Sequence, residues 1–100
     1  MPSFKSEVPH QLGKEKAVER LSSFLDVVVE KYKDQMSGMD GNWSDNVLDF
    51  SFTTFGFKIT GTLTVDEDVA RLDGKLPFAA VAFRGKIEKG ITSELERALA

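Results

Sequence analysis

The chain has 100 residues, a formal net charge of −3 and no cysteine. This length suits one domain, residues 1–100, and the hydrophobic fraction of 41% is typical of a folded chain. The lack of cysteine excludes disulfides and cysteine zinc sites, and the scattered lysines and arginines do not form the basic patch of a nucleic-acid binder. We therefore expect a cytoplasmic protein without a secretory leader, a membrane span or a nucleic-acid partner.

The first part of the chain predicts a short strand and then a long helix. Alternation over residues 4–8 is typical of a strand, and Pro9 ends it at an edge where a missing backbone donor is tolerated. From Gly13 to Met36, apolar side chains recur every three or four residues opposite charged ones, which predicts one amphipathic helix. The glycines and polar residues of 37–42 then predict a loop.

The middle of the chain carries the clearest strand patterns. Apolar and polar residues alternate over 48–53 and again over 57–65, with a break near Gly56. The three acidic residues 66–68 predict a turn before a further strand, 69–75. These segments predict an antiparallel meander that leads into a final helix.

The last quarter of the chain predicts one long helix, residues 76–99. Pro77 suits its first turn, where a missing N–H breaks no internal hydrogen bond. The apolar residues that follow at helical spacing are Ala80, Phe83, Ile87, Ile91, Leu95 and Ala98. Gly85 lies on the opposite side and could mark a bend, whereas Gly90 lies beside Phe83 at the margin of the apolar stripe. Phe83 and Gly90 are therefore candidates for helix packing or for an interface.

Together these patterns predict an α+β fold with the element order β-α-β-β-β-α. The four strands form an antiparallel sheet, and the two helices cover one face of it. The order of the strands within the sheet stays open.

No set of side chains specifies a reaction or a metal site. His10 is the only histidine, and its place before the first helix favours a hydrogen bond that positions that helix over a role as a lone acid or base. Residues 40–45 begin like a calcium loop, but Asp45 stands where such a loop needs glycine. We expect no catalytic residue, no cofactor and no metal, and hence a protein that is not an enzyme.

The aromatic residues are more suggestive, because eight phenylalanines exceed what a small core needs. Phe55 and Phe57 flank Gly56 at the predicted bend, where they could offer apolar area to a lipid, a polymer or another subunit. Trp43 is a further candidate for such a contact, as an anchor or as a lid over the core. Burial in the core is the alternative for all three side chains.

Several of these features occur together in one known family. They are His10-x-Leu12-Gly13-x3-Ala17, Trp43 ahead of the Leu48, Phe50 and Phe52 strand, the Gly61 strand, and Leu76-Pro77 leading into Phe83, Ile87, Ile91 and Leu95. In this combination the chain resembles the small polyhydroxyalkanoic acid system proteins of bacteria over nearly its whole length. The resemblance implies a cytoplasmic, non-enzymatic protein associated with polyhydroxyalkanoate granules, and it supplies no catalytic signature.

Three functions are consistent with these observations. The first is an accessory protein that contacts a hydrophobic granule surface, a lipid-like ligand or a granule protein through Phe55, Phe57 and the alanine-rich start of the last helix. The second is a homo-oligomeric structural module that pairs through the face around Gly90 or the strand at Phe4. The third is an enzyme or small-ligand carrier with a pocket between the last helix and the sheet, as in helix-grip folds.

Overall fold

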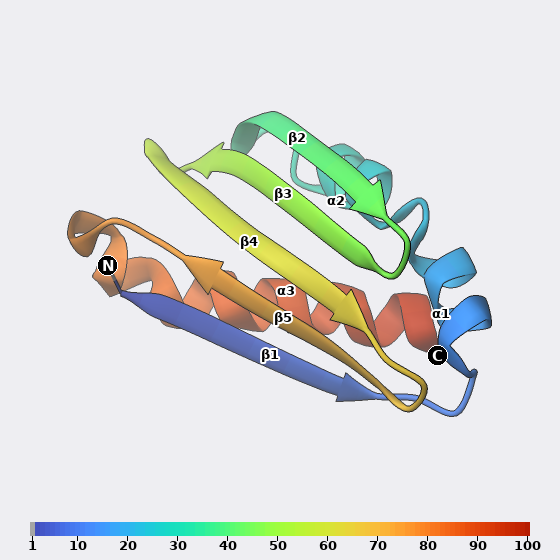
Figure 1. Cartoon of the computed structure of the whole chain (residues 1–100). Coiled ribbons are helices and arrows are strands. Elements are labelled where there is room, and N and C mark those ends of the chain that lie inside the picture. Colours follow the sequence, from blue (N-terminus) through green and yellow to red (C-terminus); the bar gives the residue numbers. More distant parts are fainter. Residues whose placement is uncertain (1) are drawn as a thin grey trace.

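The computed structural model describes residues 2–100 (Figure 1). Within these residues, three α-helices and one 3₁₀ segment accompany five strands. The strands are β1 (Ser3–Pro9), β2 (Met36–Ser44), β3 (Val47–Thr54), β4 (Phe57–Val65) and β5 (Val69–Lys75). The helical elements are α1 (Lys14–Leu21), α2 (Phe24–Lys31), the 3₁₀ segment η1 (Phe78–Phe83) and α3 (Arg84–Leu99).

All the strands join one antiparallel sheet in the order β1-β5-β4-β3-β2. The chain forms a meander from β2 to β5, and β1 then pairs with the last strand of that meander, with Phe4 opposite Gly74. This arrangement confirms the α+β class, the antiparallel pairing and the edge position of the first strand. The prediction of four strands is wrong, because β2 forms a fifth strand at the other edge of the sheet.

Strand β2 replaces the loop that residues 37–42 predict. It pairs with β3 along its length, with one register shift at Gly38, whose φ of 61° is easy for glycine alone. At Gly41, an added Cβ would overlap the side chain of Leu25, so glycine at this position lets α2 pack directly on the strand. Gly38 thus allows a bulge and Gly41 allows a close helix contact, and neither glycine belongs to a loop. The sequence alone does not distinguish these roles from those of loop glycines.

The predicted helix from Gly13 to Met36 is two shorter helices. At the end of α1, the N–H and the hydroxyl of Ser22 both donate to the carbonyl of Glu19, at 3.3 and 2.7 Å. Serine competes with helical hydrogen bonds in this way, and the adjacent Ser23 is the N-cap residue of α2. The β-branched run Val27-Val28-Val29 lowers the helix propensity further, and α2 ends at Lys31. The inward apolar positions continue across the break, which is why periodicity alone suggested one helix.

The last predicted helix divides at Arg84. The 3₁₀ segment η1 precedes it and α3 follows, with Gly85 in the first turn of α3. Pro77 lies before η1 with an extended backbone, ψ 154°, so it ends the connection from β5 and does not form the first helical turn. The two helical elements therefore differ in pitch, three residues per turn in η1 and 3.6 in α3.

A row of phenylalanine and glycine residues crosses the inner face of the sheet. The register places opposite one another, strand by strand, Phe4, Gly74, Gly61, Phe50 and Gly41. A Cβ at Gly74 would overlap the ring of Phe4, and one at Gly61 would lie 2.5 Å from Cζ of Phe50. Each ring therefore fills the space above the glycine of a neighbouring strand and covers the weak point that glycine makes in a sheet.

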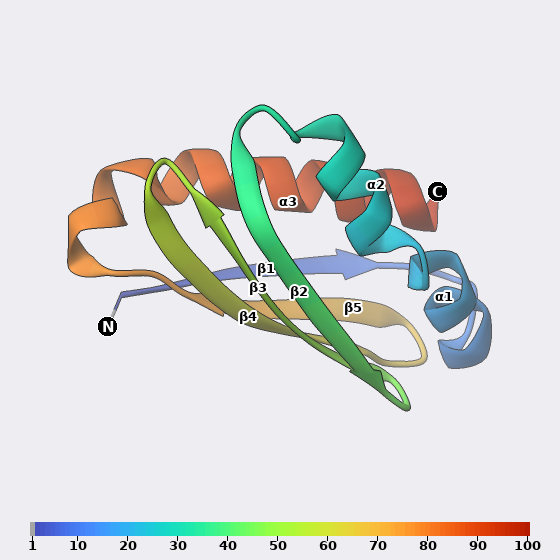
Figure 2. The ribbon, with the colours of Figure 1, turned by 90° about the horizontal axis from the view of Figure 1, so that it is seen from above.

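The helices lie on one side of the sheet, as Figure 2 shows from above. Leu21 of α1, Leu72 of β5 and Leu95 of α3 are buried together in the core between these layers. Along β1, the Ser6 and Thr92 hydroxyl oxygens lie 2.6 Å apart, which joins the strand to α3. This contact and the shared core hold α3 across the sheet.

Exchanging glycine for alanine at two positions tests the role of the phenylalanine rings. We expect Gly74→Ala to lower the free energy of unfolding by about 1–3 kcal/mol, because the new methyl group overlaps the buried Phe4 ring. Gly85→Ala is the matched control, since a Cβ there meets open space, and it should leave stability unchanged or raise it by up to about 1 kcal/mol. Urea denaturation measures both, and equal effects of the two substitutions would contradict the packing argument.

Candidate functional site

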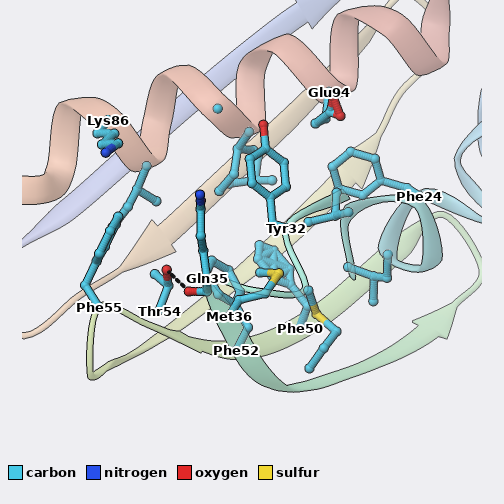
Figure 3. A pocket seen from close by; sticks show the side chains of 17 residues that line it. Phe24, Tyr32, Gln35, Met36, Phe50, Phe52, Thr54, Phe55, Lys86 and Glu94 are labelled. Carbon is cyan, nitrogen blue, oxygen red and sulfur yellow. Dashed lines mark hydrogen bonds between the residues drawn. The ribbon is translucent and has the colours of Figure 1, made fainter. Parts of the chain in front are cut away.

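A pocket of about 110 Å³ lies between α2, α3 and the inner face of the sheet (Figure 3). Its floor is formed by Phe50 and Phe52 of β3 and by Leu72 of β5. The two phenylalanine rings are stacked, with centroids 6.1 Å apart, and both side chains are buried. The floor is therefore apolar and largely aromatic.

The walls of the pocket come from the two helices. Helix α2 contributes Phe24 and Val28, the connection after it contributes Tyr32, and the first residue of β2 contributes Met36. Helix α3 contributes Ile87 and Ile91 together with a row of residues that recurs every four positions, Lys86, Gly90 and Glu94. An i, i+4 row runs along one face of a helix, so these three residues follow one another along the pocket.

Gly90 keeps this wall open. A Cβ built on it would have the Tyr32 hydroxyl 3.9 Å away as its nearest neighbour, so the space in front of the glycine is bounded by that side chain. In Figure 3 the Tyr32 side chain points from its connection toward α3. A larger side chain at position 90 would enter the pocket.

The buried polar groups of the pocket all have protein partners. The hydroxyl of Thr54 donates to the carbonyl oxygen of Gln35 at 2.7 Å. Glu94 is only 4% exposed, and its carboxylate accepts from Lys31 Nζ at 2.8 Å and from Arg97 Nη1 at 3.3 Å. A buried carboxylate needs such partners, because its desolvation is costly when it is left alone. This ion pair also ties the end of α2 to the middle of α3.

The mouth of the pocket is formed by three exposed side chains, those of Gln35, Phe55 and Lys86. Phe55 has a φ of 54° and stacks on Phe83, with ring centroids 4.6 Å apart. Lys86 Nζ lies 5.3 Å from the centroid of the Phe55 ring, within cation–π range. Among residues 2–100, no carboxylate forms a salt bridge with Lys86, so the mouth carries an uncompensated positive charge beside an aromatic ring.

Comparison with known proteins identifies the family. A family model described as "Putative polyhydroxyalkanoic acid system protein" (PHA_gran_rgn) matches residues 5–99. The chain belongs to this family. Its membership confirms the resemblance seen in the sequence, and none of the curated proteins matches the chain.

Two solved structures share the fold of this polyhydroxyalkanoic acid system protein. DynU16, a protein of the dynemicin biosynthetic locus, aligns with a TM-score of 0.61 and 12% identity over 97% of this chain, which spans 46% of the DynU16 chain. A protein from Nitrosospira multiformis aligns with a TM-score of 0.56 and 11% identity over 99% of this chain and 97% of its own length. At these identities the similarity concerns the fold alone.

The structure separates the aromatic residues that the sequence suggested as one contact surface. Phe55 lies at the pocket mouth, and Phe57 is half-buried beside Phe83, with ring centroids 6.0 Å apart. Trp43 lies on β2 opposite Leu48, at the other end of β3, and packs half-buried against the core. Of the two helix candidates, Gly90 lines the pocket and Phe83 supports Phe55.

His10 has the positioning role that its place in the sequence favoured. It is buried, its Nε2 donates to the carbonyl oxygen of Asp66 at 3.0 Å, and its Nδ1 accepts from the N–H of Leu12 at 3.2 Å. These bonds tie the start of α1 to the β4–β5 turn. Within residues 2–100, no group of three or more metal-ligating side chains comes together, and no helix is long and apolar enough to cross a bilayer.

The sequence analysis missed the polar residues of the pocket. Lys86 and Glu94 look like ordinary charged positions of an amphipathic helix, and Gln35 looks like an ordinary polar position near the end of the helix predicted from Gly13 to Met36. The available signal was their spacing, because Lys86, Gly90 and Glu94 form one row along the margin of the apolar stripe. Such a row predicts the wall of a pocket only when the position of a second element opposite the helix is known.

A double-mutant cycle on Lys31→Met and Glu94→Gln tests the ion pair behind the pocket. We expect a coupling of about 1–2 kcal/mol in urea denaturation, because the carboxylate is buried while the lysine keeps partial access to solvent. The control cycle uses the exposed pair of Glu30 and Lys33, whose coupling should stay below about 0.5 kcal/mol. Equal couplings in the two cycles would show that burial of Glu94 adds nothing.

Proposed function

We propose that this protein is a non-enzymatic accessory protein of the polyhydroxyalkanoate system that binds the apolar part of a small acyl carboxylate in the pocket between α2, α3 and the sheet. The observation that carries the proposal is the pocket itself, with its apolar floor and walls and a positively charged mouth. Binding sites for small molecules are commonly concave and apolar, with a few polar groups that fix orientation. Membership of a polyhydroxyalkanoic acid system family supports a hydroxyalkanoate as the class of ligand.

The size of the pocket limits the part of a ligand that can enter. An apolar cavity of about 150 Å³ holds one benzene molecule. The pocket of about 110 Å³ therefore suits a short hydrocarbon segment, such as the side chain of a hydroxyalkanoate unit or the end of a fatty acyl chain. The remainder of a longer ligand would leave through the open mouth.

The charge at the mouth determines which head group fits. Lys86 is the exposed cation there, and it is held near the ring of Phe55. A carboxylate at the mouth would pair with this ammonium group, and the Gln35 side chain offers a further hydrogen-bond donor. A ligand with an apolar tail and an anionic head therefore matches both parts of the site.

The buried polar groups of the pocket already have hydrogen-bond or ion-pair partners in the protein, which favours binding over catalysis. The buried acid of the pocket, Glu94, is paired with two cations, and the Thr54 hydroxyl already donates to a backbone carbonyl. Among the residues that line the pocket, no hydroxyl or amine has a neighbouring base that would activate it as a nucleophile. The proposal accordingly assigns no reaction to the pocket, and it places the protein in the cytoplasm near polymer granules.

Blocking the pocket from α3 tests the binding site. We expect Gly90→Leu to lower the affinity for 3-hydroxydecanoate at least tenfold, because the leucine side chain would fill the space in front of Tyr32. Gly85→Leu is the matched control on the same helix, since its side chain would enter open space, and it should leave the affinity unchanged. NMR titration measures both affinities, and unaltered binding by the Gly90 variant would place the ligand elsewhere.

Changing the charge at the mouth tests the orientation of the ligand. Lys86→Gln should weaken binding of 3-hydroxydecanoate by about tenfold, the effect of losing a charge-assisted hydrogen bond worth ~1.4 kcal/mol. The methyl ester of the same acid lacks the negative charge, so its affinity should change little. A parallel loss for acid and ester would indicate that Lys86 acts through packing and not through charge.

A further inference from the structure

The 3₁₀ segment η1 presents apolar side chains to solvent. With three residues per turn, residues at i and i+3 lie on one face. Ala80 and Phe83 accordingly point inward, the first fully buried and the second stacked on Phe55. Phe78 and Val81 share the outward face and are 77% and 42% exposed. A solvated helical face usually carries polar residues, so this one is suited to an apolar environment.

Basic residues accompany this apolar face. Lys75 precedes η1 and Arg84 follows it, and Lys58 comes directly after Phe57, which packs on Phe83. All three side chains are exposed, and the segments 53–58 and 75–86 contain no acidic residue in a chain whose net charge is −3. The nearest acid before Lys75 is Asp73, which forms a salt bridge with Lys5.

Four acidic residues lie in two turns at the opposite end of the sheet, where Asp66 pairs with Arg71. Asp45 lies in the β2–β3 turn, and residues 66–68 lie in the β4–β5 turn. Figure 1 shows these two turns at one end of the molecule, with η1 and the β3–β4 hairpin at the other. The η1 end, with three exposed basic residues and no acidic residue in the segments 53–58 and 75–86, is therefore the end that a negatively charged surface would attract.

We propose that the η1 end of the molecule docks on an anionic lipid surface. Phe78 and Val81 enter the apolar boundary, while Lys75, Arg84 and Lys58 contact the negative headgroups. Apolar side chains flanked by Lys and Arg are the combination that holds proteins at such interfaces, since each basic residue near the surface adds to the attraction. The exposed basic residues beside the apolar face favour a lipid surface with anionic headgroups over an uncharged apolar surface.

Docking in this orientation would bring the pocket mouth close to the lipid. Phe55 belongs to the mouth and stacks on Phe83 of η1, so the mouth and the docking face share one end of the molecule. An acyl ligand that partitions into the surface would then reach the pocket over a short path. This last step rests on the proposed ligand-binding function, whereas the docking itself does not.

Co-sedimentation with lipid vesicles tests the docking. The wild-type chain should bind vesicles of equimolar phosphatidylcholine and phosphatidylglycerol at least tenfold more strongly than vesicles of phosphatidylcholine alone. The double variants Phe78→Ser, Val81→Ser and Lys75→Glu, Arg84→Glu should each lose most of this binding. Because these side chains are exposed, both variants should keep the thermal stability and the 3-hydroxydecanoate affinity of the wild type.

Two control variants show whether the effect is confined to the η1 end. Val27→Ser removes a 54% exposed apolar side chain from α2, and Lys16→Glu reverses an exposed charge on α1, so both should leave vesicle binding unchanged. Equal binding to both kinds of vesicle, no binding to either, or an equal loss in the control variants would overturn the proposal. Gly90→Leu should retain full vesicle binding, which separates this test from that of the pocket.

Discussion

The structure depends on the way two phenylalanine rings cover the glycines of the sheet. Phe4 and Phe50 lie on strands that flank the glycine pair of β4 and β5, and each ring occupies the space that a side chain at Gly74 or Gly61 would need. At the β2 edge, Leu25 of α2 packs over Gly41 in the same way. The middle of the inner face is therefore filled by side chains that arrive from neighbouring strands and from a helix. This arrangement sets how closely the helices approach the sheet.

The pocket is a consequence of that packing. Helix α2 is anchored on β2 through Leu25, whereas α3 packs across the sheet and along β1. The two helices meet through the ion pair of Lys31 and Glu94, and the space beside that contact is lined by Phe50 and Phe52. Gly90 keeps one wall free of a side chain. The pocket thus has an aromatic floor and is bordered by the ion pair of Lys31 and Glu94. It opens beside Phe55 and Lys86.

The proposed roles of the molecule converge on one end. The pocket mouth, the exposed face of η1 and the basic residues Lys58, Lys75 and Arg84 lie there, and the β2–β3 and β4–β5 turns lie at the other end. The proposed ligand has an apolar tail and an anionic head, and the proposed lipid surface has an apolar layer and anionic headgroups. Both therefore require apolar side chains beside a positive charge. The family connects the chain with the polyhydroxyalkanoate system. DynU16 and the Nitrosospira multiformis protein, at 12% and 11% identity, show that the fold is kept at low sequence identity.

The sequence by itself determined the α+β class, the edge strand before Pro9 and the meander, because each depends on local periodicity or on turns between neighbouring segments. It favoured a positioning role for His10, but the partner of that side chain, the carbonyl of Asp66, is distant in the chain and only the structure supplies it. It also contained enough family-specific residues to identify the family. Only the tertiary structure decided that residues 36–44 form a strand, since Gly38 and Gly41 look like loop residues until a partner strand and Leu25 are in place. The same holds for the pocket. The row Lys86, Gly90 and Glu94 lines a pocket only because α2 and Phe55, which are distant in the chain, pack opposite it. A local sequence pattern cannot predict a space that lies between such elements.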